Sequence, residues 1–139
     1  MSRPRILVIE DNPADIELLR FALDRQGEEY DLEVLEDGEK ALEFIKEHRA
    51  GLRSPDPCVI LLDIHLPKYD GMQILGALKE QPQLTHINVI VISSVASPEH
   101  EKEIRALGAV YRVKPLNLRQ FMALGADIFA ICKEPALAA

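Results

Sequence analysis

The stretch VILLDIHLPKYDGMQIL, residues 59–75, joins a short apolar run to a polar turn and then to a segment with helical spacing. Its first part, Val59–Leu62, has the length of a strand and no polar residue, which is typical of a strand buried on both faces of a sheet. Similar runs rich in β-branched residues recur at Ile6–Ile9, Leu32–Leu35, Val89–Ile92 and Val110–Val113. Only the run at 32–35 alternates with polar residues, so we expect it at an edge of the sheet.

A segment with apolar residues at helical spacing follows each of these runs. Five strand and helix units in alternation predict right-handed crossovers and an α/β fold, a doubly wound parallel sheet covered on both faces. Asn12-Pro13 and Ser97-Pro98 each offer a capping side chain before a proline at the first helical position. The connector HRAGLRSPDP, His48–Pro57, has no periodicity and is expected to be an exposed loop.

Length and charge limit the function. A chain of 139 residues has the size of one domain, and we expect a single domain over 1–139 with a core at about 5–132 and no effector domain. Its 23 acidic and 16 basic side chains give a formal charge of −7. This sign argues against nucleic acid or an anionic membrane as a partner.

The cysteines and the N-terminus bear on localisation. Cys58 and Cys132 both lie in apolar runs, and two cysteines are too few for a disulfide framework or a four-ligand zinc site, so we expect a reducing compartment. The apolar run Ile6–Ile9 is too short for a signal peptide or a membrane span. Together these features favour a cytoplasmic protein.

Polar residues follow four of the predicted strands. Ligands of an open parallel sheet bind beyond the carboxyl ends of its strands, and the residues found there are Glu10, Asp11, Asp63, Ser93 and Lys114. Three carboxylates close together repel one another unless a cation lies among them. Oxygen ligands favour Mg²⁺, which commonly binds one or two carboxylates together with a phosphate.

This set of side chains suits phosphoryl transfer. A carboxylate can itself be the nucleophile, and Asp63 is the best placed to become an aspartyl phosphate. Lys114 would neutralise charge on the transferring oxygens, and Ser93 could donate its hydroxyl to one of them. Taken singly, each residue is more often a cap, a turn or a solvated side chain; the combination on one rim is what carries the hypothesis.

Four stretches of the sequence resemble the receiver domains of bacterial two-component response regulators. These stretches are ILVIEDNPADIELL, VILLDIHLPKYDGMQIL, VIVISS and VYRVKP, and the resemblance covers about 5–131. It implies a flavodoxin-like (βα)5 sheet with strand order 2-1-3-4-5. It also implies a phosphoacceptor that catalyses only its own phosphorylation and dephosphorylation, rather than an enzyme with a separate substrate.

The resemblance assigns roles to the residues of the metal site. Asp63 matches the phosphoacceptor, and Asp11 and Asp63 match direct Mg²⁺ ligands. Glu10 matches a ligand that acts largely through water, and His65 the position whose backbone carbonyl completes the site. His65 departs from the Asn or Met that is common there, so the lifetime of the phosphorylated state is expected to differ from that of relatives.

The resemblance also implies a switch. Ser93 matches the hydroxyl that follows the phosphoryl group, and Tyr111 the aromatic side chain that turns inward with it. Lys114 and Pro115 match a Lys-Pro bond that is characteristically cis in the family. The helix expected after Ser97 has a thin apolar face, so it is a good candidate for the element that shifts.

The predicted partners are proteins. The loop at His48–Pro57 and the wording of the motifs resemble stand-alone receivers partnered with phytochrome-type histidine kinases. The last helix has apolar residues around most of its circumference, which favours homodimerisation or partner docking through Phe121, Leu124 and Ile128. The alternative is that neighbouring segments of the same chain bury these three side chains.

Three other functions compete with this interpretation. A haloacid-type phosphatase would have a second Asp where this chain has His65. A flavodoxin-like nucleotide binder would need a glycine- or hydroxyl-rich loop after the first strand, where this chain has EDNPAD. A degenerate receiver that binds partners without phosphorylation is disfavoured by the complete set of site residues.

Overall fold

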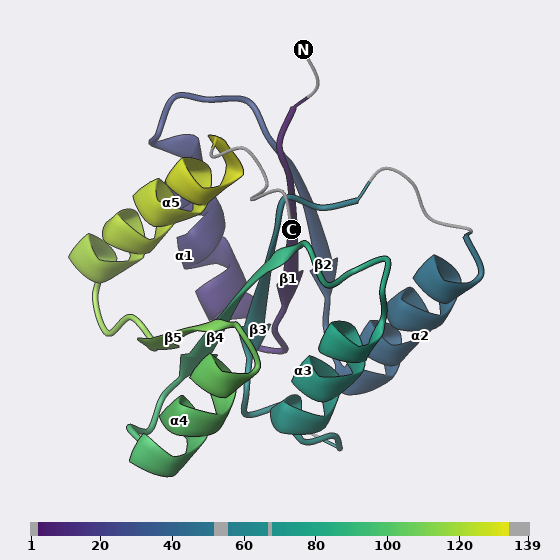
Figure 1. Ribbon diagram of the computed structural model, residues 1–139. Coiled ribbons are helices and arrows are strands. Elements are labelled where there is room, and N and C mark those ends of the chain that lie inside the picture. Colours follow the sequence, from purple (N-terminus) through teal and green to yellow (C-terminus); the bar gives the residue numbers. More distant parts are fainter. Residues whose placement is uncertain (1–2, 52–55, 67, 134–139) are drawn as a thin grey trace.

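Strands and helices alternate along the chain in the computed structural model, which describes residues 3–51, 56–66 and 68–133 (Figure 1). The strands are β1 Arg5–Ile9, β2 Asp31–Leu35, β3 Val59–Asp63, β4 Asn88–Ser93 and β5 Val110–Val113. The helices are α1 Pro13–Asp24, α2 Gly38–Arg49, α3 Gly71–Glu80, α4 Pro98–Ala106 and α5 Leu118–Lys133. All five predicted strands are present, extended by no more than one residue at either end.

The strands form one parallel sheet in the order β2-β1-β3-β4-β5. Its central strand β3 is buried at every position, whereas β2 alternates between exposed and partly buried residues before the buried Leu35. This pattern confirms the predicted fold and the edge position of β2. A strand between two neighbours and two helical layers has no wet face, so its sequence is apolar throughout.

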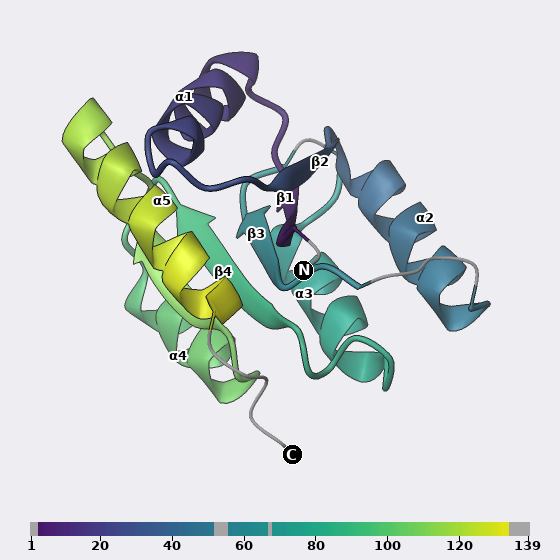
Figure 2. The same cartoon turned by 90° about the horizontal axis from the view of Figure 1, so that it is seen from above.

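Helices cover both faces of the sheet (Figure 2). One core lies between the sheet and α1 and α5, and the other lies between the sheet and α2, α3 and α4. The first core contains Phe121, Leu124 and Ile128, which are 5%, 3% and 0% exposed. The prediction that these three side chains form an intermolecular interface is therefore wrong. The helix is apolar around much of its circumference because it packs against α1 as well as the sheet.

Local signals at the helix ends mostly agree with the sequence. Asn12 and Ser97 cap α1 and α4 by accepting hydrogen bonds from the backbone N–H groups of Ala14 and His100. The loop predicted from His48 begins later, because α2 continues to Arg49 and the His48 side chain is buried against Phe44. Residues 52–55 of that loop lie outside the described residues.

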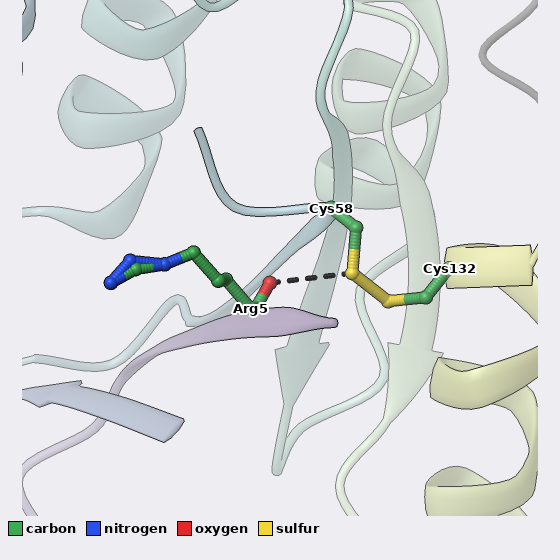
Figure 3. The surroundings of a disulfide bond; sticks show 3 residues. All are labelled: Arg5, Cys58 and Cys132. Atoms are coloured by element: carbon green, nitrogen blue, oxygen red, sulfur yellow. Dashed lines mark hydrogen bonds between the residues drawn. A yellow bond between two sulfur atoms is a disulfide. The ribbon is translucent and has the colours of Figure 1, made fainter. Parts of the chain in front are cut away.

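The two cysteines are bonded to each other, contrary to the expectation of reduced thiols. Cys58 lies just before β3 and Cys132 lies in the last turn of α5, with 5.2 Å between their Cα atoms (Figure 3). Seventy-four positions separate them in sequence. Only the packing of α5 beside the sheet brings them together, which composition could not reveal. Among the described residues no helix has both the length and the apolarity needed to cross a membrane.

Gly71 at the start of α3 allows a close backbone approach. A Cβ there would lie 2.5 Å from both the Cα and the carbonyl oxygen of Ile64, to which the Gly71 N–H donates a hydrogen bond. We expect Gly71→Ala to lower the free energy of unfolding by about 2 kcal/mol, because backbone cannot move aside as a side chain can. Urea denaturation followed by circular dichroism measures this.

Gly76→Ala is the matched control in the same helix. A Cβ at Gly76 meets no atom within 4 Å, so removal of a helix-interior glycine should stabilise the protein by roughly 0.5–1 kcal/mol. Equal effects of the two substitutions would contradict the steric explanation.

Candidate functional site

The predicted site residues come together at the carboxyl ends of the strands. Glu10 and Asp11 directly follow β1, Asp63 and Ser93 end β3 and β4, and Lys114 directly follows β5. The Lys114 backbone N–H donates to the carbonyl oxygen of Ser93 at 2.8 Å, so the rim is continuous from β4 to β5. The parallel topology thus converts four distant sequence positions into one cluster.

Three carboxylates form the centre of the cluster. Glu10, Asp11 and Asp63 each offer an oxygen, and these atoms all lie within 4.8 Å of one another. Glu10 and Asp63 are 3% and 4% exposed, whereas Asp11 is exposed. The Asp11 and Asn12 backbone N–H groups donate to Glu10 Oε2, which fixes this carboxylate. An all-oxygen set open on one side fits a hard divalent cation that retains water ligands.

Lys114 neutralises part of this negative charge. Its Nζ lies 2.9 Å from Glu10 Oε1, 3.0 Å from Asp63 Oδ2 and 2.8 Å from Asp15 Oδ2. The sequence interpretation missed Asp15. An acidic residue in the first turn of a helix is usually explained by the helix dipole, but Asp15 also lies four residues after Asp11, on a helix that begins at this rim.

The electrostatics reflect an excess of acidic groups. Burial raises the pKa of Glu10 from 4.5 to about 7, although its hydrogen bond with Lys114 opposes the shift and the Asp63 charge adds to it. Burial alone would lower the pKa of Lys114, but hydrogen bonds to its three carboxylates outweigh this and raise the pKa. The ammonium therefore stays charged, but its single positive charge does not balance the carboxylates around it, so a bound cation would be stabilised there.

Ser93 has every hydrogen-bonding position of its hydroxyl in use. Its Oγ donates to the carbonyl oxygen of Val95 at 2.7 Å and accepts from the Val95 N–H at 3.2 Å. His65 Nε2 lies 3.1 Å from the same Oγ. Because the single hydroxyl proton is directed at Val95, Nε2 must carry a hydrogen and donate it. Sequence reasoning assigned His65 only a backbone role, and this side-chain contact was missed.

Tyr111, predicted to act in a switch, contacts the same loop as this hydroxyl. Tyr111 is 9% exposed, and its hydroxyl contacts the Val95 carbonyl at 3.5 Å and accepts from the Ser97 N–H at 3.4 Å. The ring is thus already turned inward and bonded to the β4–α4 loop. Within α4, Ile104 is the sole buried side chain. The backbone carbonyl role of His65 and the cis geometry at Pro115 stay predictions.

Comparison with known proteins places these residues in a family context. The family described as response regulator receiver domain matches residues 6–124. Response regulator Rcp1 of Synechocystis sp. is 37% identical over 89 residues, which make up 64% of this chain and 60% of Rcp1, less than two thirds of that relative.

Two solved structures extend the likeness to nearly the whole chain. The phosphorylated cyanobacterial phytochrome response regulator RcpA superimposes with a TM-score of 0.81, 30% identity and 91% coverage of both chains. The Mn²⁺-bound form of Rcp1 gives a TM-score of 0.82 and 30% identity, and covers 97% of this chain and 99% of its own.

Proposed function

The chain belongs to the response regulator receiver domain family, and we propose that it takes a phosphoryl group onto Asp63 from a histidine kinase in a two-component phosphorelay. The observation that carries this proposal is the buried Asp63 carboxylate, bonded to Lys114 Nζ at 3.0 Å inside a cluster of acidic groups. A buried aspartate carboxylate can act as the nucleophile, and an ammonium bonded to one of its oxygens can stabilise the negative charge of the incoming phosphoryl group.

The reaction forms a bond between an Asp63 oxygen and phosphorus while the bond from phosphorus to the donor breaks. The His65 backbone N–H donates to Asp63 Oδ1 at 2.8 Å and Lys114 Nζ donates to Oδ2, so the carboxylate is held in a fixed orientation. Lys114 also offers its charge to the incoming phosphoryl oxygens. Bound Mg²⁺, held by Glu10, Asp11, Asp63 and the carbonyl of His65, would supply further positive charge at those oxygens.

Phosphorylation would then change the hydrogen bonds of Ser93. The group adds about −1.5 to −2 charges and three strong acceptor oxygens. Ser93 can donate to one of them only by releasing Val95, because its one proton is already in use. The β4–α4 loop moves with it, and α4, anchored by Ile104, follows at low cost. Couplings of about 1–3 kcal/mol suffice for such a shift.

The hydrogen bond from His65 Nε2 to Ser93 Oγ holds Ser93 in its unphosphorylated position, and we call this contact the latch. We expect His65→Ala to speed hydrogen exchange of the Val95 amide about fivefold in the unphosphorylated protein, since one hydrogen bond of roughly 1 kcal/mol is lost. Amide exchange measured by NMR tests this. His86→Ala is the control, because His86 contacts Asp56, outside the site. Unchanged exchange in His65→Ala would contradict the latch.

A small phosphodonor provides the direct test of the function. Incubation with acetyl phosphate and Mg²⁺ should add one phosphoryl group by intact mass, and peptide mapping should place it at Asp63. Chelation of Mg²⁺ should prevent the addition, because the carboxylate cluster then lacks its cation. Labelling at other residues, or equal labelling with the chelator, would overturn the proposal.

Relatives suggest the kinase. Rcp1 and RcpA are response regulators, and RcpA is described as a phytochrome response regulator; we therefore propose a phytochrome-type kinase. The proposal of a cytoplasmic location rests on the short apolar run Ile6–Ile9 and no longer on the cysteines, which are bonded to each other. Phosphotransfer from a phytochrome kinase should be faster than transfer from an unrelated histidine kinase at equal concentration.

Homodimerisation through the region of the last helix is also part of the proposal. Because Phe121, Leu124 and Ile128 are buried, we propose that the exposed residues Val113, Leu116 and Leu118 form the dimer surface.

A further inference from the structure

The Cys58–Cys132 disulfide lies away from the phosphorylation site. Cys58 precedes the first residue of β3, whereas Asp63 is the last residue of that strand. The bond joins the start of β3 to the last turn of α5, beside the first residue of β1 (Figure 3). Receiver chemistry at the opposite end of the sheet makes no use of these sulfurs.

The disulfide is accessible from solvent. Both cysteines are only partly buried, and both line a surface pocket of about 810 Å³. A pocket of this size admits a small thiol or disulfide next to the sulfur atoms. Access of this kind is a condition for thiol–disulfide exchange, in which a thiolate must reach a sulfur.

The surroundings of Cys58 suit the reduced state as well. Its Sγ lies 3.3 Å from the carbonyl oxygen of Arg5. In the disulfide this sulfur has no proton, so the approach is a close contact; after reduction the thiol can donate a hydrogen bond to the same oxygen. Breaking the bond therefore leaves the Cys58 sulfur with a polar partner already in place.

Besides the disulfide, the described contacts of the last turn of α5 are weak: Ile131 packs against the core but is only partly buried. Lys133 pairs with Glu28, but the two side chains are 65% and 38% exposed, and exposed pairs contribute little. One turn earlier, Phe129 is 3% exposed and packs edge-on against Tyr30. Loss of the disulfide should thus release the residues after Phe129 while the core of the domain persists.

We propose that Cys58 and Cys132 are a reversible dithiol–disulfide modification site that fastens the end of α5 to the sheet. In oxidation, one cysteine thiolate attacks a small-molecule disulfide such as oxidised glutathione and expels one glutathione thiolate. The second cysteine thiolate attacks the resulting mixed disulfide and expels the other. Two electrons pass to glutathione, and the two protons lost by the cysteines end on its two thiols. Excess reduced glutathione drives the same steps backwards.

Exchange is measured on the native chain in buffers of graded oxidised and reduced glutathione. After acid quenching and alkylation, intact mass should show two species, one with no alkyl group and one with two, whose ratio follows the buffer. Two alkylatable thiols under a large excess of oxidised glutathione would overturn the site. A bond that reduced glutathione opens only after the protein is denatured would overturn its reversibility.

The second part of the proposal, that the disulfide fastens the end of α5 to the sheet, is tested by a separate measurement. Oxidation should raise Tm by about 10 °C, since the bond closes a long loop in the unfolded chain, and should slow amide exchange at Ile131 and Cys132. Cys58→Ser and Cys132→Ser are matched controls, which should form one mixed disulfide each and show neither effect. Equal Tm and equal exchange in the two redox states of the native chain would overturn the fastening.

Discussion

Asp63→Asn is expected to abolish phosphorylation by acetyl phosphate. The amide keeps the shape of the side chain but is a far weaker nucleophile than the carboxylate that now accepts hydrogen bonds from Lys114 and the His65 N–H. Intact-mass measurement with Mg²⁺ should show one added phosphoryl group in the native chain and none in the variant.

Asp15→Asn is the matched control for this substitution. It makes the same chemical change on a carboxylate that contacts the same Lys114 Nζ, at 2.8 Å. Asp15 is not in the cluster of carboxylates that could share a cation, so labelling should persist. Equal labelling of the native chain and Asp63→Asn would reject Asp63 as the acceptor. An unlabelled native chain would instead favour the degenerate receiver that binds partners without phosphorylation.

The strand-end residues were predictable because the fold itself has a simple sequence code. An apolar run such as Val59–Leu62 predicts a buried strand, and parallel strands bring their carboxyl ends to one rim, so Asp63 and Lys114 could be placed together without coordinates. Their geometry confirms that they meet; their chemical roles remain proposals.

The residues that were missed have ordinary local explanations. Asp15 fits a helix N-terminus, and His65 has a backbone role in the family pattern, so neither sequence position suggested its side-chain contacts. The apolar character of α5 was correctly seen but wrongly assigned, because the sequence does not say that α5 packs against α1 as well as against the sheet. For the same reason the sequence could not predict that Cys132 pairs with Cys58, because the pairing depends on where α5 packs.

Lys114→Gln should have a large effect on stability in the absence of divalent cations. The Lys114 side chain is 16% exposed, and its ammonium contacts Glu10 and Asp63 side chains that are only 4% and 5% exposed. Its removal leaves these carboxylates close together without a counter-charge. We expect the free energy of unfolding to fall by about 3 kcal/mol, a decrease in Tm of roughly 10 °C for a domain of this size.

Arg112→Gln is the control, because it removes a cation of the same strand region from an exposed pair. Arg112 and Asp127 are 43% and 39% exposed, so the loss should stay below about 1 kcal/mol. Calorimetry with a chelator and then with Mg²⁺ distinguishes loss of the counter-charge at the carboxylate cluster from a general loss of stability. Added Mg²⁺ should raise the Tm of Lys114→Gln more than that of the native chain, since the unneutralised carboxylates bind the cation without competition from the ammonium. If Mg²⁺ raises both Tm values equally, Lys114 and the cation do not share the charge of this cluster.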